Sequence, residues 1–196
     1  MNETKTQRPA QTLATAAMLL ALGYLLPFFT GQIPQIGQML CPMHLPVLLC
    51  GFLCGWRYGL ATGFLLPLLR CFLAGTPPFY AALAMTFELA AYGFLAGFLY
   101  ARSRWQCVIA LYRCLLLAMI GGRVVWAVAK VLLSGVSGQT FTWELFLSGA
   151  FFTAIPGIIL QLVFIPAVMT ALDRTGLVRF RRGGEARQAA WAAERS

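Results

Sequence analysis

The residues most capable of chemistry in this chain are charged side chains that lie within long apolar stretches. A charge inside a bilayer is costly, so such a residue is a candidate functional residue. Arg70, Glu88 and Arg123 belong to three different stretches and fall at similar depth in each. Lys130 lies nearer the outer end of its stretch, whereas Arg113 lies in an inner half and can extend toward the headgroups. Arg70, Glu88 and Arg123 are therefore candidates to contact a ligand at that depth.

One of these stretches carries a stripe of cationic and aromatic side chains on a single helix face. Arg123, Trp126 and Lys130 are spaced i, i+3 and i+7, which places them on the same side of a helix. Gly121 and Gly122 come directly before them and allow close approach of another helix or of a ligand. Two cations beside an indole suit a flat ligand that carries a negative group. The stripe is therefore a candidate ligand site.

The balance of charge bears on the kind of ligand. In the simplest alternative, Arg123 pairs with Glu88 and the rest of the stripe is packing. One glutamate cannot neutralise Arg70, Arg123 and Lys130 together, so positive charge remains. That surplus favours an anionic or zwitterionic ligand over a cationic one.

Other chemistries find little support in the sequence. The single histidine, His44, stands where the first outer loop meets the second apolar stretch, as either a ligand contact or an interfacial residue. Cys50 and Cys54 are four residues apart, but no nearby His or Asp completes a metal site, so we interpret them as packing residues. An intramembrane enzyme would need a Ser–His pair, an Asp pair or metal ligands. We therefore expect no catalytic centre, no metal and no cofactor.

The elements that must position these residues are long apolar stretches. The chain of 196 residues is 60% apolar and 11% charged, against about 45–50% and about 25% in soluble domains. This composition excludes a disordered chain, a nucleic-acid-binding domain and an ordinary water-soluble enzyme. Six stretches are candidates for membrane-spanning helices, although the second is short. They cover residues 11–29, 44–56, 58–74, 79–101, 105–133 and 146–172.

The distribution of charge predicts how these helices are oriented. The formal net charge is +9, and the Lys and Arg residues outside the stretches lie in the two tails and in the turns after the second and fourth helices. The opposite loops, residues 30–43, 75–78 and 134–145, contain no Lys or Arg. By the positive-inside rule both termini face the cytoplasm. We therefore predict an all-α integral membrane protein: a compact six-transmembrane-helix bundle over residues 11–172, with cytoplasmic tails at 1–10 and 173–196.

Four segments of the sequence together are similar to a known family. They are the alanine-rich first helix with Ala17 and Ala21, residues 45–52 followed by Gly55 and 58–59, residues 87–93 followed by Gly97 and Tyr100, and residues 122–125 with 156–161. In this order and spacing, the chain resembles the substrate-binding S components of energy-coupling factor (ECF) vitamin transporters. The resemblance covers the whole six-helix region.

The resemblance implies a function and a set of partners. S components bind a vitamin or related micronutrient on the outer side of the bacterial plasma membrane, under a lid that here would be residues 30–43. They have no ATPase of their own and work with a membrane scaffold subunit and two cytoplasmic ATPases. Docking to the scaffold uses small residues of the first helix, which here would be Ala14, Ala17 and Ala21. A plain connector would explain the uncharged loop equally well.

The resemblance does not name the substrate. Phe79 and Tyr80, with Trp126, are candidates to stack on a ring, and Gln161 is a candidate to contact a polar edge. The surplus of positive charge favours an anionic ligand and disfavours thiamine, which is a cation. The alternative function is a small-molecule transporter or exporter that works without an ATPase partner. The basic C-terminal tail is able to contact anionic lipid headgroups, and no nucleic-acid partner is expected.

Overall fold

The computed structural model describes residues 9–29, 42–103, 108–137 and 155–174, and within these ranges its helices are joined by short turns and no strand is present. The helices are α1 (Pro9–Phe29), α3 (His44–Cys54), α4 (Trp56–Ala74), α5 (Phe79–Arg102), α6 (Val108–Ser137) and α8 (Ile155–Arg174). Each predicted stretch corresponds to one of these helices, which confirms the all-α fold. The start predicted for the last stretch, residue 146, lies outside the described residues.

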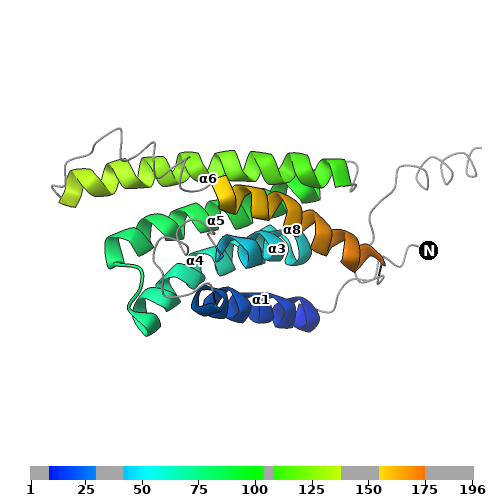
Figure 1. Ribbon diagram of the computed structural model, residues 1–196, viewed down its shortest axis with the longest axis horizontal. Helices are drawn as coiled ribbons and strands as arrows, with labels where there is room; N and C mark the ends of the chain where they lie inside the picture. Colours follow the sequence, from blue (N-terminus) through cyan, green and yellow to red (C-terminus); the bar gives the residue numbers. More distant parts are fainter. Residues whose placement is uncertain (1–8, 30–41, 104–107, 138–154, 175–196) are drawn as a thin grey trace, which may run out of the picture.

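The short helix α3 forms the centre of the bundle. Every residue from His44 to Phe52 is buried, and α3 packs against α1, α4, α5 and α8. Its 11 residues span roughly 16 Å, about half the thickness of a bilayer core. In Figure 1, α1 and α6 lie on opposite sides of the bundle, with α3 and α5 between them. The polar residue that begins α3, His44, is therefore held inside the protein.

Glycines bring α3, α4 and α5 into backbone contact. A Cβ atom added at Gly59 of α4 would lie 2.6 Å from the carbonyl oxygen of Gly93 on α5, and one added at Gly51 of α3 would lie at the same distance from that oxygen. A Cβ at Gly97 would lie 2.5 Å from the backbone nitrogen of Trp56. Such approach requires residues without side chains. The contacts fix the register of α5, and with it the height of Glu88.

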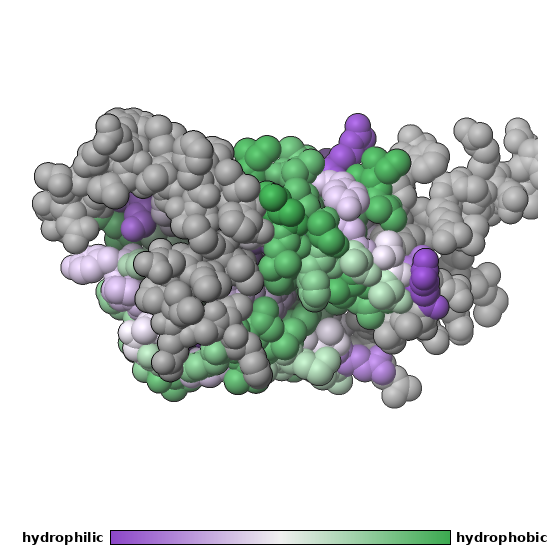
Figure 2. All heavy atoms as spheres, in the orientation of Figure 1, coloured by the Kyte–Doolittle hydropathy of each residue, from purple (hydrophilic) through white to green (hydrophobic). Residues whose placement is uncertain are grey.

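Four of the described helices are long and apolar enough to cross a membrane. The qualifying segments are Ala10–Phe28, Phe79–Arg102, Val108–Leu133 and Gly157–Arg174. The helix α3 is apolar but short, and α4 has sufficient length but contains Arg57 and Arg70, which lower its hydropathy. Figure 2 shows hydrophobic side chains across the middle of the visible face. The molecule is thus a multi-pass membrane protein.

Candidate functional site

A buried carboxylate joins three helices near the middle of the bundle. The Oε1 atom of Glu88 on α5 lies 3.2 Å from Nη1 of Arg123 on α6 and 3.6 Å from Nε2 of His44 at the start of α3. The side chains of Glu88 and His44 are each 3% exposed, whereas that of Arg123 is 19% exposed. We call Glu88, His44 and Arg123 the buried charge cluster. Arg123 is the member that remains partly accessible.

Tyr92 and Gly122 set the geometry of this cluster. Tyr92 follows Glu88 by one helical turn, and its ring meets the ring of His44 edge-on, with centroids 5.0 Å apart. The ring also lies against the backbone of α6, where a Cβ added at Gly122 would lie 2.8 Å from a ring carbon of Tyr92. The missing side chain at Gly122 lets α6 approach α5. The next residue, Arg123, can therefore reach Glu88.

The cluster combines a hydrogen-bond acceptor with a donor in a region of low dielectric. A single ionised carboxylate at such a site would be strongly destabilising, and the nearby guanidinium offsets that cost. The pair can also serve a ligand, because a carboxylate accepts hydrogen bonds and a guanidinium donates several in one plane. The arrangement suits recognition of a small polar molecule.

The cation–indole stripe continues from the cluster along α6. The guanidinium carbon of Arg123 lies 5.9 Å from the centre of the Trp126 ring, and Nζ of Lys130 lies 5.8 Å from it. Both distances are close to the outer limit of about 6 Å for a cation–π contact. The three side chains thus lie together on one helix face, where cationic and aromatic groups are available side by side.

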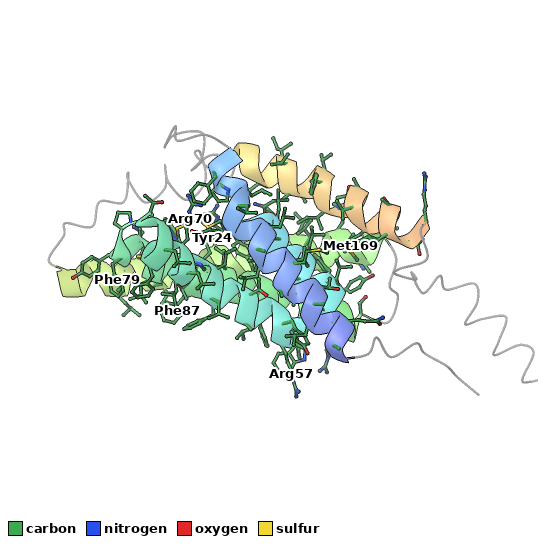
Figure 3. All side chains as sticks on the ribbon, turned by 90° about the horizontal axis from the view of Figure 1, so that it is seen from below. Tyr24, Arg57, Arg70, Phe79, Phe87 and Met169 are labelled. Carbon is green, nitrogen blue, oxygen red and sulfur yellow. The ribbon has the colours of Figure 1, made fainter. Side chains whose placement is uncertain are left out.

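Arg70 makes its contacts with α1. Its Nη1 atom donates to the carbonyl oxygen of Tyr24 at 3.4 Å, and its guanidinium lies 5.0 Å from the centre of the Phe28 ring. Figure 3 shows Arg70 beside Tyr24. Within the described residues, Glu88 is therefore approached by Arg123 and His44, while Arg70 joins α4 to the C-terminal end of α1.

The remaining predicted substrate residues lie on α8 and at the start of α5, where the rings of Phe79 and Tyr80 meet edge-on. Gln161 on α8 is 3% exposed, and its side-chain carbonyl oxygen has no hydrogen-bond partner in the described part of the chain. Phe79 and Tyr80 begin α5 and are 53% and 59% exposed. They precede Glu88 by nine and eight residues, or roughly 12–14 Å along the helix axis, and Figure 3 shows Phe79 at the end of α5.

The predicted docking face and lid differ in what the structure describes. Ala14, Ala17 and Ala21 are all exposed, on the side of α1 that faces away from the bundle, whereas Ala16 is buried against the bundle. Of the predicted lid, residues 30–41 lie outside the described residues. The two that follow, Pro42 and Met43, are buried. Among the residues described, no three His, Cys, Asp or Glu side chains gather as a metal site would require.

Sequence reasoning missed Tyr92 and the role of Gly122. Tyr92 is neutral and lies among apolar residues, so nothing in its type separates it from core packing. The available signal was its position four residues after Glu88, since residues i and i+4 share a helix face. Gly122 was recognised as a point of close approach, but its partner could not be identified from the sequence.

Comparison with known proteins finds a match between this chain and one protein family. A family model described as ECF transporter, substrate-specific component, matches residues 11–169. No curated protein and no solved structure matches the chain. The matched region runs from the first turns of α1 into α8 and includes the whole buried charge cluster.

Proposed function

Because the chain belongs to the family of ECF transporter substrate-specific components, we propose that it captures a vitamin or related micronutrient at the outer face of the bacterial plasma membrane. It delivers this substrate inward together with an ECF scaffold subunit and two cytoplasmic ATPases. The family match over residues 11–169 carries the proposal. The family is one of transport components and not of enzymes, and the multi-pass helical fold is consistent with it.

The substrate site that we propose is centred on the buried charge cluster. Arg123 and Glu88 offer a donor and an acceptor to the polar part of the substrate. His44 contributes a second polar contact at the start of α3, and Gln161 contributes an amide from α8. A buried side-chain carbonyl oxygen without a partner costs free energy, and a hydrogen bond from a ligand would remove that cost.

The stripe on α6 bears on the charge of the substrate. Since Glu88 offsets Arg123, the surplus cation beside the indole is Lys130. A substrate with a ring against Trp126 and an anionic group near Lys130 would use both side chains. This supports an anionic or zwitterionic substrate. Arg70 keeps its positive charge, but the contacts that the structure gives it are with α1.

Two further features belong to this proposal. Phe79 and Tyr80 stand at the outer end of α5, where we assign them to the rim that an entering substrate meets. The exposed alanines Ala14, Ala17 and Ala21 form a flat strip on α1, which we assign to docking with the scaffold. All six helices lie within the membrane in this arrangement, with both termini in the cytoplasm and residues 30–43 as the lid.

Reconstituted transport tests this function. Vesicles containing the chain with an ECF scaffold and its ATPases should accumulate the substrate only when ATP is present on the side of the ATPases. Vesicles containing the chain alone should bind the substrate without accumulating it. Accumulation by the chain alone would contradict the proposal and favour a transporter without an ATPase partner.

A further inference from the structure

Two exposed residues begin α4 at the end of the bundle remote from Phe79. Trp56 is 38% exposed, Arg57 is also exposed, and the guanidinium carbon of Arg57 lies 5.2 Å from the centre of the Trp56 ring. Figure 3 shows Arg57 pointing away from the bundle. Trp residues concentrate at the boundary between hydrocarbon and headgroups, and the arginine extends beyond it. This end of α4 therefore lies at a membrane surface.

Aromatic rings extend from this point along α5. The ring of Trp56 meets that of Phe94 edge-on, with centroids 5.7 Å apart, and Phe94 stacks on Phe98 at 5.5 Å. Phe98 is 39% exposed. Such contacts hold the rings in fixed positions at low entropic cost. The indole thus has a defined orientation at the surface.

A second arginine lies at the same end of the helix pair. Gly97 of α5 is in backbone contact with Trp56 of α4. Arg102 is exposed and follows Phe98, the last ring of the series that starts at Trp56, by four residues. It therefore lies on the same face of α5 as Phe98, roughly 6 Å farther along the axis, toward the headgroups. Neither Arg57 nor Arg102 forms an ion pair within the described ranges of the chain.

On the other side of Trp56, the surface is apolar. Leu60 and Phe64 follow Trp56 at i+4 and i+8 and are 39% and 43% exposed. The surface therefore changes, over two turns of helix, from two arginines to an indole and then to aliphatic and aromatic side chains. This is the order of polarity found in a phospholipid, from phosphate through glycerol to acyl chain.

We propose that the surface formed by Trp56, Arg57, Leu60, Phe64 and Arg102 binds an anionic phospholipid. Arg57 and Arg102 donate to its phosphate oxygens, the indole of Trp56 lies at the level of the glycerol, and an acyl chain lies along Leu60 and Phe64. Arginine suits this role because its planar donors match phosphate oxygens. The excess of two positive charges selects a lipid with net negative charge over a zwitterionic one.

Native mass spectrometry of the purified, delipidated full chain tests this site. The chain is titrated with phosphatidylglycerol or with phosphatidylcholine of the same acyl composition. We expect phosphatidylglycerol to bind at least five-fold more tightly. The double substitution Arg57→Gln with Arg102→Gln should remove this preference, whereas Arg57→Lys with Arg102→Lys should keep most of it. The lysine variant separates a requirement for charge from a merely structural effect.

Two controls define the outcomes. Arg174→Gln changes an exposed arginine at the end of α8, and it should leave the preference for phosphatidylglycerol unchanged. Inorganic phosphate in excess should not displace the lipid, because the acyl chain contributes to binding. Equal binding of the two lipids, retention of the preference in the glutamine variant, or displacement by inorganic phosphate would each overturn the proposal.

Discussion

The interaction between Glu88 and Arg123 offsets the free-energy cost of burying a charge at the centre of the molecule. Both side chains come from helices that are apolar on either side of them, and they lie 3.2 Å apart. A buried ion pair is weak evidence for stability in itself, but removing one partner leaves a charge without compensation. If the substrate site that we propose is correct, stability and substrate binding depend on the same two residues.

Arg123→Gln should lower the free energy of unfolding by about 3 kcal/mol, since breaking a buried pair typically costs about 3–5 kcal/mol. The double variant Glu88→Gln with Arg123→Gln should recover much of that loss, because neither side chain is then charged. Thermal unfolding of the wild type, both single variants and the double variant measures this coupling. Additive losses would show that the two charges do not interact.

A second residue-scale prediction concerns Gly122. A methyl group there would press on the ring of Tyr92, so Gly122→Ala should destabilise the protein by about 1–3 kcal/mol, as overpacked cores do. Gly135 on the same helix has no atom within 4 Å of an added Cβ. Gly135→Ala should therefore be neutral or stabilising, by up to about 1 kcal/mol. If both variants melted alike, the contact between Tyr92 and Gly122 would be unimportant.

At this scale, the sequence predicts which residues are able to interact better than it predicts which neighbour each side chain faces. The sequence allows Glu88 to pair with Arg70, to pair with Arg123 or to contact a ligand, and the structure has the pair with Arg123. The stripe of Arg123, Trp126 and Lys130 follows directly from helical spacing. Counting residues gives the depth of Arg70 in its helix but not the neighbour that its face meets. That neighbour depends on the packing of α4 against α1, which the sequence does not show.

At the scale of elements, helix boundaries were predictable and helix surroundings were not. Apolar stretches end where charges, glycines and prolines begin, and the observed helices end near the same residues. The short length of the second stretch was visible in the sequence. Its enclosure by four other helices depends on glycine contacts between α3, α4 and α5 that only the structure reveals.

The exposed strip on α1 leads to a prediction about partners. Ala17→Phe with Ala21→Phe should abolish ATP-dependent uptake while leaving substrate affinity within about two-fold, because bulky side chains prevent close helix contact. Ala167→Phe changes an exposed alanine on α8 and serves as the matched control, with normal uptake expected. Unimpaired uptake by the α1 variant would place the docking surface elsewhere.

At the scale of the whole molecule, the composition and the distribution of charge predict a membrane bundle and its orientation. Four described helices satisfy the length and hydropathy of a membrane span. The helices α3 and α4 lie within the same bundle but are short or carry arginines. Their position in the membrane is therefore a matter of packing with the other helices, which sequence hydropathy does not capture.

Single-cysteine labelling tests the orientation. In a variant without the native cysteines, a cysteine at Thr76, which is exposed between α4 and α5, should react with a membrane-impermeant maleimide in intact cells. Cysteines at Asn2 and Ser196 should react only after the membrane is opened. Labelling of either tail in intact cells would rule out six spans with both termini inside.

The most direct test of the central claim is native mass spectrometry of the purified wild type beside the Glu88→Gln with Arg123→Gln variant. The wild type should retain one small molecule per chain, identifiable by its mass. The variant, in which both buried charges are removed together, should remain folded and lose that molecule. Equal retention by the two proteins would contradict a substrate site at the buried charge cluster, and the absence of any bound molecule from both would contradict high-affinity capture.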